Sequence, residues 1–70
     1  MTIKAGYYQK INGEMIKVHD VINDDESYNE YVLYQDHRAR YWIMPALKFK
    51  RTELYNGKIQ HVYRFIRELD

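Results

Sequence analysis

Two Asn-Gly pairs, Asn12-Gly13 and Asn56-Gly57, constrain the fold of this 70-residue chain more than any other feature. Each pair stands between short stretches in which apolar and polar residues alternate, which is the pattern of a half-buried strand. A two-residue type I′ turn requires positive φ at both central positions, and Asn tolerates this while Gly adopts it freely. The sequence therefore predicts two β-hairpins, one near each end of the chain.

Alternation and turn-forming residues also place the elements between and around these turns. Strand-like stretches cover 7–11, 14–22, 28–35, 41–44, 51–55 and 58–66, with polar turns at 23–27 and 36–40. Val21 and Ile22 break the alternation, which predicts a bulge. Pro45 ends its strand because proline has no N–H for the ladder, and 46–49 then forms one helical or 3₁₀ turn.

Short strands at this spacing predict one all-β domain, residues 1–70, of about five strands. An SH3-like barrel is the preferred form and an OB-like barrel is the alternative. A barrel of this size has no room for an internal ligand cavity, so binding is expected on the outer surface or between subunits. Beyond Phe65 the apolar spacing fits both a strand and a helical turn, and both remain open.

Composition narrows the class of protein further. The chain has no cysteine, which excludes disulfides and Cys-based zinc sites, and eight tyrosines supply much of its apolar area. It has neither a long apolar run nor a signal-peptide core, so we expect a cytoplasmic protein without a membrane partner. The richness in Ile, Lys, Asn and Tyr is typical of AT-rich coding DNA and indicates a bacterial or phage origin.

Charge is strongly segregated along the chain although the net charge is only +1. Six acidic residues and no Lys or Arg lie between Val18 and Asp36, whereas eight Lys or Arg and one acid lie between His37 and Arg67. The simpler account is that oppositely charged strands pair across the sheet. The alternative is a molecule with one acidic and one basic face.

No residue pattern indicates catalysis, a metal or another cofactor. His19, His37 and His61 lie far apart in sequence, with no two at metal-ligand spacing on one element. Ser27 lies in an acidic turn, where a hydroxyl most often caps the turn. We therefore expect a protein that is not an enzyme and that works by binding.

Tyrosines favour a protein partner or a second copy of the chain. Tyr is enriched at protein interfaces because it adds contact area at low entropic cost. The domain is too small to bury all of its tyrosines, so we expect an exposed patch drawn from Tyr7, Tyr28, Tyr31, Tyr55 and Tyr63. Protein–protein interaction or self-association, for example as a homodimer, is the leading functional prediction.

The alternative is binding of nucleic acid or a nucleotide-like ligand. A basic and aromatic segment runs from Tyr41 and Trp42 to 48–51, and aromatic side chains can stack on bases while Lys and Arg contact phosphates. Trp42 and Phe49 are more simply explained as core residues. The predicted ligand contacts are therefore Lys48, Lys50, Arg51 and Arg64.

Four segments, GYYQKING, YVLYQD, YWIMPALKF and NGK followed by YRF, resemble the motifs of a bacterial family called domain of unknown function 1653. The matching residues are Gly6, Tyr8, Gly13, Tyr34, Trp42, Pro45, Phe49, Gly57, Lys58, Arg64 and Phe65. The resemblance covers most of the chain in order. It implies a compact SH3-like β fold in which these positions, apart from Lys58 and the predicted ligand contact Arg64, are mainly structural, and it implies no established activity.

The chain departs from the family pattern where that pattern carries its most ligand-like residues. Lys10 and Ile11 replace a His and a Tyr, Met44 replaces an Arg, and the acidic turn 23–27 replaces a segment containing Arg and His. Any ligand contacts made by those family residues are therefore expected to be absent here. These departures fit a diverged, phage-encoded protein that modulates its host.

Overall fold

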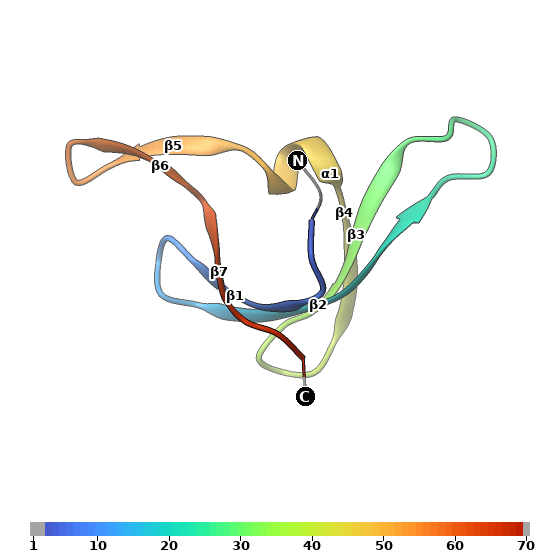
Figure 1. Ribbon diagram of the computed structural model, residues 1–70, viewed down its shortest axis with the longest axis horizontal. Coiled ribbons are helices and arrows are strands. Elements are labelled where there is room, and N and C mark those ends of the chain that lie inside the picture. Colours follow the sequence, from blue (N-terminus) through green and yellow to red (C-terminus); the bar gives the residue numbers. More distant parts are fainter. Residues whose placement is uncertain (1–2, 70) are drawn as a thin grey trace.

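The computed structural model describes residues 3–69, and these form seven strands and one short helix (Figure 1). The elements are β1 (Gly6–Lys10), β2 (Met15–Asn23), β3 (Glu30–Gln35), β4 (Tyr41–Pro45), α1 (Ala46–Phe49), β5 (Thr52–Tyr55), β6 (Lys58–His61) and β7 (Tyr63–Arg67). The mostly-β class and the single helical turn after Pro45 are as expected from the sequence. No helix among the described residues has the length and apolar character needed to cross a membrane.

The two Asn-Gly pairs both form hairpins but use different turns. Asn56 and Gly57 have φ values of 53° and 77°, so β5 and β6 are joined by the expected type I′ turn. At the first pair only Gly13 has positive φ, at 95°, and its N–H donates to the Lys10 carbonyl at 2.8 Å. The first turn is therefore a three-residue loop with glycine at the left-handed position, and the type I′ prediction was wrong there.

Five strands make one antiparallel sheet in the order β4-β3-β2-β1-β7, and β5 and β6 form a separate two-stranded sheet. The main sheet is strongly bent, and α1 lies on its concave side (Figure 1). The first and last strands of the chain, β1 and β7, are neighbours. Within residues 3–69, β4 and β7 are the two outer strands of an open sheet, so the expected closed barrel is not formed. The structure has seven strands, rather than about five, and one reason is that the expected stretch 58–66 is divided into β6 and β7.

One such break lies at Val62, which separates β6 from β7 in what the sequence predicted as one strand. Val62 is only 1% exposed, its N–H donates to the Arg51 carbonyl and its carbonyl accepts from the Ile11 N–H. After this bend β7 leaves the hairpin and pairs with β1, and it stays extended to Arg67. The chain beyond Phe65 is thus strand and not a helical turn. The bulge in β2 lies between Val18 and Asp20, slightly earlier than expected.

The core fills the concave side of the sheet and is small. Its buried residues are Tyr8, Ile16, Val18, Val32, Met44, Ala46 and Phe49, with Ile3, Tyr34 and Tyr63 packed against them. Phe49 is buried as expected. Trp42 is 45% exposed, so its placement in the core was wrong. It lies near the start of the outer strand β4, next to the turn from β3, and Met44, two residues later on the same face, takes the core position.

The segregated charges lie on different parts of the molecule and do not form cross-strand ion pairs within residues 3–69. The two ion pairs among the described residues, Arg40 with Asp36 and Arg51 with Glu53, join neighbours in sequence. Most of the acidic stretch lies on the arm formed by the ends of β2 and β3, on the side of the molecule opposite the β5–β6 hairpin (Figure 1). The predicted pairing of oppositely charged strands is therefore not found in this part of the chain.

Candidate functional site

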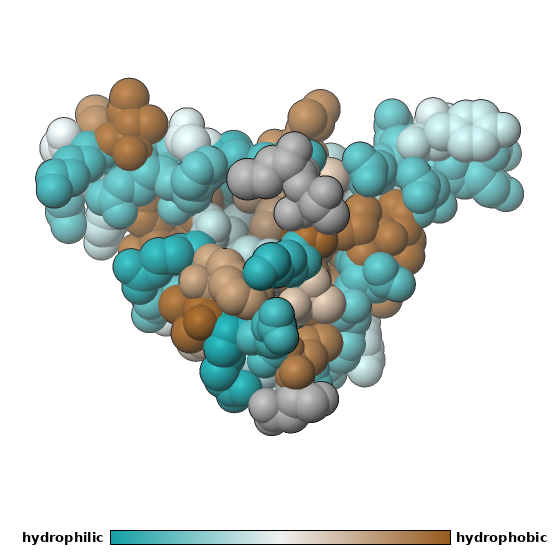
Figure 2. Space-filling model, viewed as in Figure 1, coloured by the Kyte–Doolittle hydropathy of each residue, from teal (hydrophilic) through white to brown (hydrophobic). Residues whose placement is uncertain are grey.

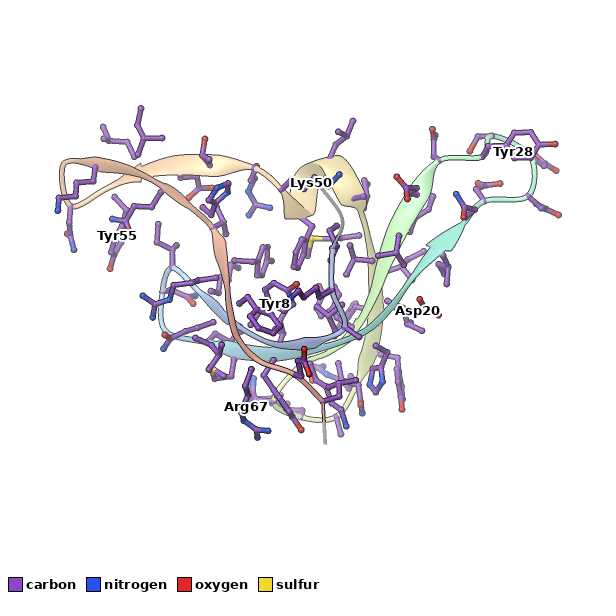
Figure 3. The ribbon with its side chains drawn as sticks, viewed as in Figure 1. Tyr8, Asp20, Tyr28, Lys50, Tyr55 and Arg67 are labelled. Carbon is purple, nitrogen blue, oxygen red and sulfur yellow. The ribbon has the colours of Figure 1, made fainter. Side chains whose placement is uncertain are left out.

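A cleft of about 470 Å³ opens where the N-terminal segment, β1, the end of α1 and β7 meet. We call it the aromatic cleft. Its lining residues are Ile3, Lys4, Tyr8, Phe49, Lys50, His61, Tyr63, Arg64 and Phe65. Figure 3 shows Tyr8 on the concave side of the bent sheet and Lys50 across from it, near α1.

Four aromatic rings form a continuous wall of this cleft. The Tyr8 ring meets Phe49 edge-on at 5.0 Å between ring centroids and Phe65 edge-on at 5.4 Å. Phe49 in turn stacks on Tyr63, with centroids 4.7 Å apart and ring planes 4° from parallel. The Tyr8 hydroxyl donates to the Lys4 carbonyl at 2.8 Å. These contacts hold the four rings against one another.

Three basic side chains border the wall, and none of them forms an ion pair within residues 3–69. Lys4 Nζ lies 5.0 Å from the centre of the Phe65 ring. Arg64 Nη2 donates to the neutral side-chain oxygen of Gln9 at 2.9 Å. The half-buried Lys50 forms no ion pair or side-chain hydrogen bond within residues 3–69. No Asp or Glu of residues 3–69 lines the cleft itself, although Asp20 and Glu30 line the adjoining hollow that Lys50 also borders.

The tyrosines add no negative charge to the cleft near neutral pH. Burial raises the pKa of the Tyr8 hydroxyl, partly offset by its hydrogen bond to the Lys4 carbonyl. Burial also raises the pKa of Tyr63, partly offset by Arg51. Both hydroxyls therefore remain protonated well above pH 7, and the cleft is positive over the physiological range.

Two of the four predicted ligand contacts line this cleft, and two do not. Lys50 and Arg64 come together there, although thirteen residues separate them in sequence. Lys48 is exposed on α1 and does not line the cleft. Arg51 supports the local structure, because it bonds Glu53 at 3.3 Å and the Lys48 carbonyl at 2.9 Å and lies 5.8 Å over the Tyr63 ring.

Sequence reasoning missed the parts that Lys4 and His61 take in the cleft, and it named Tyr63 only among the tyrosines from which an exposed patch was expected. The alternation of Tyr63 and Phe65 along β7 is a signal that both face the same way. Nothing in the sequence marks Lys4. The three histidines stay apart: His19 contacts Gln35 and Tyr41, His37 lies in a turn, and His61 lines the cleft. Residues 3–69 contain no group of three His, Asp or Glu that could hold a metal ion.

The predicted tyrosine patch is dispersed. Tyr28 and Tyr55 lie at opposite ends of the molecule (Figure 3), and Tyr63 belongs to the aromatic cleft. Tyr7 is covered by Arg67, whose guanidinium lies 4.1 Å from the ring centre. Tyr31 is half-buried. These five residues therefore do not form one surface.

Aliphatic side chains form a different exposed surface, on the β5–β6 hairpin. All eight residues of its two strands are exposed. Leu54 and Ile59 face each other across the hairpin and are 73% and 78% exposed. Figure 2 shows apolar side chains standing out over this hairpin and over α1, where Leu47 is 84% exposed. We call Leu54 and Ile59 the hairpin pair.

Comparison with known proteins supports the fold expected from the sequence motifs. The sequence matches no protein-family model and no curated protein. The structure is similar to the crystal structure of a Bordetella bronchiseptica protein belonging to the family domain of unknown function 1653. The TM-score is 0.83 with 15% sequence identity, and the match covers 97% of this chain and 92% of that chain. The chain therefore has the fold of a solved member of the family that its motifs resemble.

Proposed function

We propose that this protein is a non-enzymatic binding module that associates with protein, in the first instance with a second copy of itself, through the β5–β6 hairpin. The observation that carries the proposal is the balance of apolar side chains. Among the described residues twelve large hydrophobic side chains are exposed, whereas eight hydrophobic residues are buried. A domain this small depends on buried apolar area for its stability. A partner that covers some of the exposed hydrophobic side chains adds to the apolar area that the small core buries.

The hairpin is the part of this surface best suited to a partner. Side chains alternate between the two faces of a strand, so the hairpin pair shares one face while Glu53 and Lys58 lie on the other. An isolated two-stranded hairpin is only marginally stable in water. Covering the hairpin pair removes two large aliphatic side chains from solvent and also stabilises the hairpin that carries them.

A second copy suits this face because the contact is self-complementary. Leu54 and Ile59 are directly opposed, so two hairpins related by a twofold axis place each Leu against an Ile of the other copy. No Asp, Glu, Lys or Arg accompanies the pair on its face of the hairpin, so the two copies meet without like-charge repulsion.

The proposal also covers the type of β fold and the cellular location of the protein. We place it as an open variant of the small SH3-like barrels, supported by the bent antiparallel sheet and by the pairing of its first and last strands. The cytoplasm of a bacterium, or of a phage-infected bacterium, is the proposed location. The fold match to a bacterial protein is consistent with it.

Sedimentation velocity over a range of concentrations tests the self-association. Wild type is expected to shift from monomer to dimer as concentration rises. The double variant Leu54→Thr/Ile59→Thr keeps strand-compatible side chains but loses the aliphatic contacts. Each buried Leu or Ile contributes about 1.5 kcal/mol or more, so we expect the dimer affinity to fall by roughly a hundredfold or more.

Tyr28→Ser is the matched control, because Tyr28 is 79% exposed at the far end of the molecule. It is expected to leave the monomer–dimer equilibrium unchanged. A wild-type chain that remains monomeric at every concentration contradicts the proposal. So does a double variant that dimerises as tightly as wild type.

A further inference from the structure

We propose that the aromatic cleft binds a small ligand that combines one flat aromatic ring system with an anionic group, of the size and chemistry of a nucleoside monophosphate. This goes beyond the proposed association through the hairpin, because the hairpin pair does not line the cleft. The two proposals therefore succeed or fail separately.

The charge of the cleft selects an anion. Lys4, Lys50 and Arg64 border it, none of them forms an ion pair within residues 3–69, and no carboxylate of the described chain lines it. An anionic ligand group gains charge-assisted hydrogen bonds from the half-buried Lys50 and from the exposed Lys4 and Arg64. Lys and Arg together match phosphate oxygens well.

The wall of the cleft selects an aromatic ring. Tyr8, Phe49, Tyr63 and Phe65 hold one another through edge-to-face and stacked contacts. Phe65 is 37% exposed, so its ring is accessible to a ligand although it belongs to the wall. Nucleic-acid bases of every kind can stack on aromatic side chains, because each base has a planar π-face. A volume of about 470 Å³ lies within the range of roughly 300–1,000 Å³ found for small-molecule sites.

The surroundings favour a single small ligand over a nucleic-acid strand. A second hollow of about 470 Å³ adjoins the aromatic cleft and shares Ile3 and Lys50 with it. This neighbour is lined by Asp20 and Glu30, which repel further phosphates. With a net charge of +1 the chain also lacks the broad basic surface that a polyanion needs.

Lys50 is the residue on which the inference depends most. Its side chain lies where the aromatic cleft and the acidic hollow meet, and the described structure gives its ammonium group no ion pair. Removing that charge therefore costs no internal contact of the fold. Lys48 provides a matched control, because it lies two residues earlier, is exposed and does not line the cleft.

Isothermal titration calorimetry with the full chain tests the inference. The probes are the four common nucleoside 5′-monophosphates, the corresponding nucleosides, inorganic phosphate and a single-stranded ten-residue oligoadenylate. At least one monophosphate is expected to bind about tenfold or more tightly than its nucleoside and than inorganic phosphate, since ring and anion contacts act together. Lys50→Gln is expected to lower the affinity for that monophosphate by about tenfold and to leave the affinity for the nucleoside unchanged.

Lys48→Gln is expected to bind every probe like wild type. Both variants are expected to have the thermal unfolding temperature of wild type. That result would show that weaker binding by Lys50→Gln does not come from misfolding. The inference is overturned if none of the four monophosphates binds at concentrations up to about 1 mM, or if the two Gln variants weaken binding equally. Tighter binding of the oligoadenylate than of any monophosphate also overturns it and identifies a nucleic-acid surface instead.

Discussion

At the scale of single residues, Asp36 organises the turn that leads into β4. One carboxylate oxygen accepts the backbone N–H groups of Arg38 and Arg40 at 2.9 and 3.1 Å. The other accepts the Trp42 indole N–H at 2.8 Å and Arg40 Nε at 3.1 Å. This network explains why the only tryptophan is held at the rim of the sheet and not in the core. The indole N–H finds a charged acceptor there, which a small apolar core does not offer.

These hydrogen bonds predict that stability falls in acid through Asp36. The Trp42 indole N–H, together with the backbone N–H groups of Arg40 and Arg38, holds the pKa of Asp36 well below its usual range. A carboxyl group whose folded pKa lies below its unfolded value stabilises the fold above the unfolded pKa, about 3.9, and loses this contribution as pH falls. Thermal unfolding temperatures of wild type should therefore drop more steeply from about pH 5 to about pH 2 than those of Asp36→Asn.

Circular dichroism melts across this pH range provide the measurement. Asp25→Asn is the control, since the structure gives Asp25 no hydrogen bond or ion pair within residues 3–69. It should retain the acid profile of wild type. Equal acid profiles for wild type and Asp36→Asn would show that the network does not stabilise the carboxylate.

At the scale of elements, β1 is the strand on which the fold depends. It pairs with β2 on one side and with β7 on the other, and its Tyr8 joins the core to the aromatic cleft. The close approach of β7 requires a glycine at position 6. A Cβ added there would lie 2.6 Å from the Arg67 carbonyl oxygen and 2.6 Å from Phe65 Cε1. Gly6, one of the residues shared with the family pattern, is thus explained by contact between two strands.

Gly6→Ala is expected to destabilise the protein by about 1–3 kcal/mol, as overpacking does, and to loosen β7 in particular. Urea unfolding measures the free energy, and amide hydrogen exchange shows which strand opens. Gly13→Ala is the control, because a Cβ there meets nothing within 4 Å although its φ of 95° strains the backbone. It should cost stability without raising exchange in β7. An unchanged exchange rate in β7 of Gly6→Ala would contradict the steric argument.

At the scale of the whole molecule, the chain is elongated, with extents of 40 × 26 × 20 Å. A small core at the centre of the bent sheet carries two arms, one acidic at the ends of β2 and β3 and one formed by β5 and β6 (Figure 1). The aromatic cleft lies near the centre and the hairpin pair lies on an arm. The two surfaces proposed for binding thus lie in different parts of the molecule.

This arrangement predicts that the hairpin can be removed without loss of the fold. The Val62 N–H donates to the Arg51 carbonyl at 3.2 Å, so the two ends of the hairpin are already adjacent. Replacing residues 52–61 by a two-residue Asn-Gly link should leave a chain that unfolds cooperatively, with a free energy of unfolding within about 1 kcal/mol of wild type, because an exposed hairpin adds little. Dimerisation should be lost. Chemical denaturation and sedimentation velocity measure the two effects, and an unfolded variant would show that the hairpin is needed for folding.

Much of the secondary structure could be predicted from the sequence because it depends on local residues. Asn56 and Gly57 accept positive φ, Pro45 cannot extend a ladder, and alternating residues mark the strands. The turn at Asn12 and the break at Val62 were not accessible in the same way. The first depends on the register in which β1 pairs with β2, and the second on hydrogen bonds of Val62 with Ile11 and Arg51.

The sequence by itself determined the class of the fold, the two hairpins, the helical turn and the absence of disulfides. Tertiary structure alone decided that the sheet stays open, that Trp42 lies outside the core and that the tyrosines disperse. It also decided that Lys4, Lys50 and Arg64 converge on one aromatic wall. Hairpin turns depend on neighbouring residues, whereas convergence and burial depend on contacts between segments far apart in the chain, where many pairings compete.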